Sequence, residues 1–268
     1  MSKYLALVKI FFNSAIIKRA DFFGNMIITL IQISAIILLW TAIFDNQRTL
    51  NGYTLSDTIS YYILVLFISY ASTITTADYI ANNIKSGTLS QWLLKPWNIL
   101  YCELSRSIGD QIYRLIILFP IFLIIGLFLH FQTNTQLLLS LSISSTILGI
   151  VFVIIGFFIN CLFEYSLAML AFWLDEVWSI KHFKEVITDL LGGKRIPLSF
   201  FPAFLRTFNN YLPFQFFYFI PIEYFLGKRN YENLFLDLTL SSLWIIFLVI
   251  VANILYSFGL KRYGAFGN

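Results

Sequence analysis

Long apolar stretches separated by short polar segments dominate the pattern along this chain. An α-helix rises about 1.5 Å per residue, so about 20 apolar residues cross the hydrocarbon core of a bilayer. The pattern therefore predicts an all-α integral membrane protein. The clearest predicted spans are residues 22–44, 58–78, 108–129, 137–160 and 238–260.

A sixth span is expected between residues 161 and 237, because the basic residues that follow the last span favour the inner side of a membrane. Residues 164–191 are the only helix-like candidate, although they carry several charged side chains, which are costly against lipid. At helical spacing His182, Glu185 and Asp189 form one stripe, which is expected to face protein or water. A five-span chain with an external C-terminus is the competing topology.

The helix predicted over residues 164–191 has two further features. Lys181 precedes Glu185 by four residues, a spacing at which opposite charges pair and reduce the cost of burial. The side largely opposite the charged stripe is apolar and consists of Phe183, Val186, Ile187 and Leu190.

The orientation of the spans follows from the distribution of lysine and arginine. Cytosolic loops carry an excess of these residues. They are frequent before residue 20 and between residues 85 and 114, whereas the first two loops on the other side carry only Arg48. The N-terminus is therefore predicted to be cytosolic, and with six spans the C-terminus is cytosolic too. Residues 1–20 are basic and moderately amphipathic, which predicts a helix lying in the membrane interface.

The polar loop over residues 80–101 contains one short predicted helix, 88–96. Thr88 with Gln91 is typical of a capping box at its start, and Pro96 is expected to end it. A helix with an apolar face in a cytosolic loop either lies on lipid headgroups or docks a soluble partner. The apolar residues of this face are Leu89, Trp92, Leu93 and Leu94.

The segment 192–230 is rich in aromatic residues and too interrupted by proline to span a membrane. Irregular backbone at membrane depth must be buried in protein or line a cavity. This segment is therefore predicted to form short re-entrant or interfacial helices. The prolines that are expected to divide it are Pro197, Pro202, Pro213 and Pro221.

Composition narrows the function classes. The chain has 59% hydrophobic and only 12% charged residues, so the bilayer is its main solvent. The net charge of +4 is explained by basic residues beside the spans and needs no nucleic acid.

Cys102 and Cys161 are predicted to be reduced thiols near the cytosolic face. With only two histidines, no metal site and no histidine-based catalysis are expected. The nearest approach to a phosphate-binding loop, at residues 193–195, lacks the upstream glycine and the hydroxyl, so no nucleotide or other cofactor is expected on this chain.

Two motifs carry a resemblance to a known family. Gly-Thr-Leu followed by Leu-Leu-Lys-Pro occupies residues 87–96, and Gly-Gly, Ile-Pro-Leu, Phe-Pro and Leu-Pro-Phe follow one another over residues 192–214. Together with the order of spans, they resemble the membrane subunits of type-2 ABC exporters, in the branch once described only as a domain of unknown function. The resemblance covers residues 1–268 as a single transmembrane permease domain.

This resemblance implies a permease in a bacterial cell membrane, paired with a second permease of the same or a different kind. Two cytosolic subunits would bind ATP and Mg²⁺ and drive export, while this chain itself contacts membrane lipids and is not an enzyme. Residues 88–96 would be the coupling helix, with Thr88, Leu89, Trp92, Leu93, Leu94 and Pro96 contacting an ATPase. Residues 192–230 would be the re-entrant outer region. The stripe of His182, Glu185 and Asp189 would face the other permease or the translocation path.

Ser90 departs from the family pattern, since an acidic residue is expected there in many relatives. Two other function classes remain open at this point. The chain could be an integral membrane transferase acting on a lipid-linked substrate, with the charged segment 164–191 as its active site. It could also be a membrane anchor without a transport role, which would predict spans free of polar residues.

Overall fold

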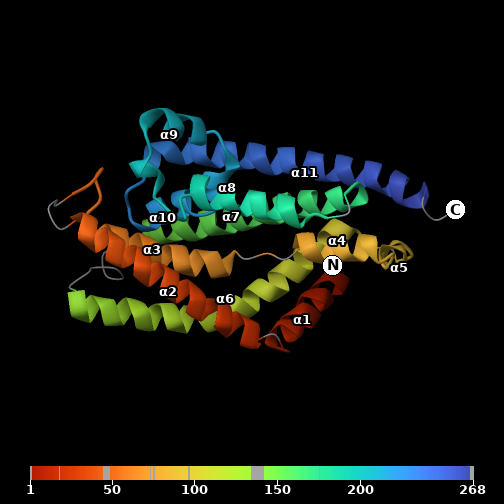
Figure 1. Ribbon diagram of the computed structural model, residues 1–268, viewed down its shortest axis with the longest axis horizontal. Helices are drawn as coiled ribbons and strands as arrows, with labels where there is room; N and C mark the ends of the chain where they lie inside the picture. Colours follow the sequence, from red (N-terminus) through yellow and green to blue (C-terminus); the bar gives the residue numbers. More distant parts are fainter. Residues whose placement is uncertain are drawn as a thin grey trace.

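Helices of very different lengths lie side by side along one long axis (Figure 1). The computed structural model describes residues 2–17, 19–44, 49–72, 74, 76–95, 97–133, 142–174 and 176–265. These residues contain no β-strand, so the prediction of an all-α protein is confirmed for the part of the chain that they cover. The first helix, α5 and the C-terminus lie toward one end of the long axis, and α9 lies at the other.

The longer helices carry the apolar stretches of the sequence. Within the described ranges, three segments are long and apolar enough to cross a membrane: Leu55–Lys85, Ile143–Phe172 and Tyr231–Tyr263. The prediction of six spans goes further than this and stays a prediction. The helices that contain the apolar stretches are α2 (Arg19–Phe44), α3 (Leu55–Ala71), α4 (Thr76–Lys85), α6 (Ile99–Thr133), α7 (Ile143–Met169) and α11 (Leu234–Ala265).

The first helix, α1 (Ser2–Ile17), packs along the start of α6. A Cβ atom on Gly109 would lie 2.6 Å from the carbonyl oxygen of Val8, so glycine permits this close contact. Rings also meet across the contact, with centroids 5.8 Å apart between Tyr4 and Tyr101. The predicted helix is therefore present and packs on the protein through one side, while its place in the membrane interface stays a prediction.

At the centre of the bundle, α7 packs against α4, α10 (Phe219–Phe225) and α11. Two glycines of α7 allow α10 and the residues before it to approach closely. A Cβ atom on Gly156 would lie 2.3 Å from the carbonyl oxygen of Phe216, and one on Gly149 would lie 2.6 Å from the ring of Phe225.

The proline-rich segment forms several short helices, as predicted. They are the 3₁₀ turns η2 (Leu198–Phe200) and η3 (Pro213–Phe216) and the α-helices α9 (Ala203–Asn209) and α10, followed by η4 (Tyr231–Asn233). Phe216, Ile220 and Ile222 are fully buried, so these short pieces pack against the rest of the protein. Their position at membrane depth stays a prediction. Pro221 does not divide the segment, because it lies in the first turn of α10, where its missing N–H costs no helical hydrogen bond.

Three predicted spans differ from the structure. The span predicted over residues 58–78 is divided between α3, which ends at Ala71, and α4, which begins at Thr76. The helix α6 begins at Ile99, well before the predicted start at 108. The prediction of one helix over residues 164–191 is wrong: α7 continues to Met169, η1 covers Leu170–Phe172, and α8 covers Trp178–Leu191. The apolar pattern of α7 continues to Phe172, and the chain then turns before α8 begins at Trp178. With 14 residues, α8 is only about 21 Å long.

Candidate functional site

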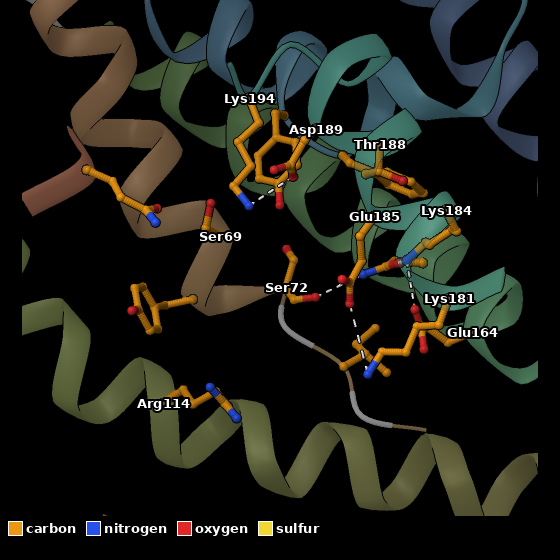
Figure 2. Close-up of a pocket in the computed structure, with 16 residues that line it drawn as sticks. Ser69, Ser72, Arg114, Glu164, Lys181, Lys184, Glu185, Thr188, Asp189 and Lys194 are labelled. Atoms are coloured by element: carbon orange, nitrogen blue, oxygen red, sulfur yellow. Dashed lines mark hydrogen bonds and ion pairs between the residues drawn. The ribbon is translucent and has the colours of Figure 1, made fainter. Parts of the chain in front are cut away.

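A cavity of about 620 Å³ lies between α8, α3, α6 and α7. Figure 2 shows α8 on one side, Ser69 and Ser72 on the side of α3, and Arg114 rising from α6 across from α8. Polar and charged side chains dominate the lining within an otherwise apolar protein. The labelled lining residues are Ser69, Ser72, Arg114, Glu164, Lys181, Lys184, Glu185, Thr188, Asp189 and Lys194.

The most buried charges of the cavity join α7 to α8. Lys184 Nζ lies 2.8 Å from Glu164 Oε1 and donates a 2.6 Å hydrogen bond to Asn160 Oδ1. The amide of Asn160 in turn donates to the carbonyl oxygen of Ser72 at 2.9 Å. Lys184 is 8% exposed and Glu164 2% exposed, so both charges depend on each other for compensation.

A second set of charges lies at the start of α8. Lys181 forms an ion pair with Asp78 of α4, and its Nζ lies 4.0 Å from Glu185 Oε1, which confirms the predicted pairing of Lys181 with Glu185. His182 Nδ1 lies 2.9 Å from the other carboxylate oxygen of Glu185. The ring of His182 packs edge-on against Trp178.

The third set follows the end of α8. Asp189 receives Lys194 Nζ at 2.9 Å and Arg195 Nη2 at 3.1 Å. Burial disfavours the charged form of Lys194, but Tyr218 and Asp189 act in the opposite direction and the pKa of this lysine is raised overall. Lys194 is therefore charged at neutral pH.

The predicted stripe is only partly brought together. Glu185 and Asp189 line the cavity, whereas His182 does not. Phe183 and Val186 were predicted to lie largely opposite the charged stripe. They are 67% and 66% exposed and do not line the cavity.

The sequence-based list of site residues lacks five charged residues that line the cavity. The sequence does contain a signal for Glu164. This isolated carboxylate stands at the end of a long uncharged stretch, and a buried carboxylate requires a nearby cation. Its partner could not be identified without knowing that the chain turns back after α7. The five residues are Arg114, Glu164, Lys181, Lys184 and Lys194.

The predicted coupling helix corresponds to α5 (Leu89–Leu93) at the end of the bundle that also holds the C-terminus (Figure 1). Leu89 is buried at 3% exposure, and the Trp92 ring packs edge-on against Tyr79 of α4. Leu93 and Leu94 are 42% and 87% exposed. The apolar face is therefore divided between an inner part that anchors α5 and an outer part that is open.

The start of α5 differs from the prediction. Thr88 has helical backbone angles and makes no side-chain capping bond, so the capping box with Gln91 is absent. The Thr88 hydroxyl instead donates to Asn83 Oδ1 at 3.0 Å, because Gly87 reverses the chain with a φ of 74°. Pro96, predicted to end the helix, lies outside the described residues.

A tyrosine from the last helix holds α5 in place. The hydroxyl of Tyr263 on α11 donates to the carbonyl oxygen of Gly87 at 3.0 Å. The Ser90 hydroxyl lies 2.8 Å from the hydroxyl oxygen of the same tyrosine, Tyr263. Ser90, the residue that departs from the expected acidic pattern, therefore contacts α11.

The other end of the bundle holds paired charges. Lys228 Nζ lies 3.0 Å from Asp57 Oδ2, and Arg229 Nε donates to Asp237 Oδ2 at 2.8 Å. The basic residues that a six-span topology places on the outer side are thus mostly compensated by carboxylates. Ion pairing reduces the conflict between their position and the excess of basic residues expected inside.

The chain matches a known protein family over most of its length. The family described as "ABC-2 family transporter protein" matches residues 30–267, a range that includes the cavity, α5 and the proline-rich segment 192–230. No curated protein and no solved structure matches the chain. Because the matched range covers most of its length, this chain belongs to the ABC-2 family of transporter proteins.

Proposed function

We propose that this chain is the permease subunit of an ATP-driven exporter in a bacterial cell membrane. It forms the translocation path with a second permease, and two separate cytosolic subunits bind ATP and Mg²⁺. Both termini and α5 face the cytosol in this proposal, and the short helices before α11 face outward. Membership of the ABC-2 family supports a transport role in the membrane, and the finer assignments rest on the geometry described above.

The open side of α5 is the observation that carries the proposal. Leu93 and Leu94 are exposed at the tip of the bundle, on a helix whose inner side is fixed by buried Leu89. An exposed pair of leucines on a fixed base suits a groove on a soluble partner, since burial of one such side chain contributes about 1.5–3 kcal/mol.

A chain of contacts leads from α5 into two neighbouring helices. The Trp92 ring meets Tyr79 of α4 at a centroid distance of 5.9 Å. The guanidinium of Arg106 on α6 lies 3.8 Å from the centre of the same Tyr79 ring and 3.3 Å from Glu103. A displacement of α5 by an ATP-binding subunit would therefore reach α4 and α6. Helix α6 contributes Arg114 to the cavity lining, and Asp78 of α4 forms an ion pair with the lining residue Lys181.

The test is co-purification of the complex with its ATP-binding subunits. Leu93→Asp and Leu94→Asp each place a charge in the docking groove, so we expect both to lose the ATP-binding subunits while the permease still inserts. Phe204→Asp on α9 is the matched control, because Phe204 is 71% exposed at the opposite end. Normal complex yield and normal export by both α5 variants would contradict docking at α5.

A second variant separates docking from transmission. Tyr79→Ala removes the ring that joins Trp92 to Arg106 and leaves Leu93 and Leu94 in place. We expect the complex to form at normal yield but to export more slowly per ATP hydrolysed. Unchanged coupling in this variant would show that the movement passes by another route.

A further inference from the structure

Two buried oxygen atoms in the cavity make no hydrogen bond within the described part of the chain. They are Glu164 Oε2 and Thr188 Oγ1. Glu164 is 2% exposed and Thr188 7% exposed, and both line the cavity. A buried polar atom without a partner costs about 1–3 kcal/mol, so a group that enters the cavity and donates hydrogen bonds to this wall would recover that cost.

The charges of the cavity indicate which donor fits. Its lining holds four cationic side chains, Arg114, Lys181, Lys184 and Lys194, against the three carboxylates of Glu164, Glu185 and Asp189. An ammonium group would meet a surplus of positive charge. An anion would lie beside the unsatisfied carboxylate oxygen of Glu164. A hydroxyl group meets neither penalty, because it is neutral and can both donate and accept.

We infer that this cavity binds the neutral, hydroxyl-bearing head group of the exported molecule, such as a sugar or polyol group. One hydroxyl donates to Glu164 Oε2 and another exchanges a hydrogen bond with Thr188. Apolar atoms in the same lining, from Ile74 and Phe217, contact the carbon skeleton of the head group. A cavity of this volume is in the usual range for a small-molecule site.

This inference rests on the proposed export function, but its test does not depend on the ATP-binding subunits. Loss of ATPase docking would reject the proposed function and leave binding to the cavity measurable. Loss of binding to the cavity would reject this inference and leave docking on α5 intact.

The experiment measures binding of three short amphiphiles to the full chain in lipid nanodiscs by saturation-transfer NMR. The probes are hexyl β-glucoside, hexyltrimethylammonium and hexyl sulfate, which share one alkyl chain and differ in head group. We expect saturable binding of the glucoside at least about fivefold tighter than that of either charged probe, with empty nanodiscs as the background.

Two variants locate the site. Thr188→Val keeps the shape of the side chain and removes a hydroxyl that has no partner in the described structure, so it should fold normally and bind the glucoside about fivefold more weakly. Glu164→Gln should weaken binding further, but it also disturbs Lys184. Thr207→Val on α9 is the control, since the hydroxyl of Thr207 bonds only its own helix at Ala203 and lies outside the cavity lining.

Equal binding of the three probes would overturn the inference. Unchanged glucoside affinity in Thr188→Val would do the same, because it would mean that water alone satisfies these two oxygens.

Discussion

Two short helices are joined to α7 by opposite means. Helix α10 is held by apolar contact: Phe152 of α7 stacks on Tyr224 at a centroid distance of 4.8 Å, and the backbone at Phe216 fits against Gly156. Helix α8 is held by ion pairs, above all between Lys184 and Glu164. Close apolar packing resists displacement, whereas a charged contact tolerates water beside it. The cavity lies beside α8. We therefore propose that α10 belongs to a fixed frame, the part that keeps its position during transport, and that α8 forms the working surface, the part that contacts the exported molecule.

The largest expected effect comes from breaking the ionic contact on one side only. Lys184→Met leaves Glu164 buried without its cation, and such a loss costs about 3–5 kcal/mol of stability. We expect a clear fall in the thermal unfolding temperature of the purified chain. The double variant Lys184→Met, Glu164→Met should recover most of it, because well-packed apolar residues often replace a buried ion pair at little cost. If the unfolding temperature of the double variant stays as low as that of Lys184→Met, the ion pair stabilises the fold by more than mutual charge compensation.

A smaller loss is expected from a single added methyl group in the apolar contact. In Gly156→Ala the new Cβ meets the carbonyl oxygen of Phe216, so the helices must separate, and overpacking of this kind costs about 1–3 kcal/mol. Thermal unfolding measures the loss. Gly24→Ala is the control, since nothing lies within 4 Å of its added Cβ. If Gly156→Ala and Gly24→Ala have the same unfolding temperature, Gly156 and the backbone of Phe216 are not in close contact.

The smallest effect is expected at His182, on the side of α8 that faces away from the cavity. His182 is about half exposed and pairs only with partly exposed Glu185, and surface pairs of this kind contribute about 0–1 kcal/mol. His182→Ala should therefore leave both stability and export close to wild type. Glu185→Gln, which alters the cavity lining, should lower export while changing stability little. Equal export by the two variants would remove the distinction between the two sides of α8.

Much of the fold follows from the one-dimensional pattern. The apolar stretches 22–44 and 238–260 predicted helices that the structure contains within α2 and α11, and the prolines of segment 192–230 predicted short pieces. In each case the signal is local, because helix length and proline geometry depend on neighbouring residues.

The remainder depends on contacts that the pattern does not encode. The turn after Phe172 brings Lys184 beside Glu164, and this pairing compensates the two most buried charges of the cavity. Likewise, the Thr88 hydroxyl bonds Asn83 because of the reversal at Gly87, so a capping pattern read along the chain gave the wrong partner. Site residues such as Lys184 and Lys194 were missed for the same reason.

The most direct test of a working surface beside a fixed frame is the reaction of single cysteines with a hydrophilic thiol reagent. Thr188→Cys reports on the cavity and Ile222→Cys on the buried frame, in a chain whose buried Cys102 and Cys161 are replaced by alanine. The complex with its ATP-binding subunits is compared with and without bound ATP. The account predicts that Thr188→Cys reacts in both states with rates that differ about tenfold, while Ile222→Cys stays protected. Equal reactivity of the two cysteines, or a rate at Thr188→Cys that ATP leaves unchanged, would contradict it.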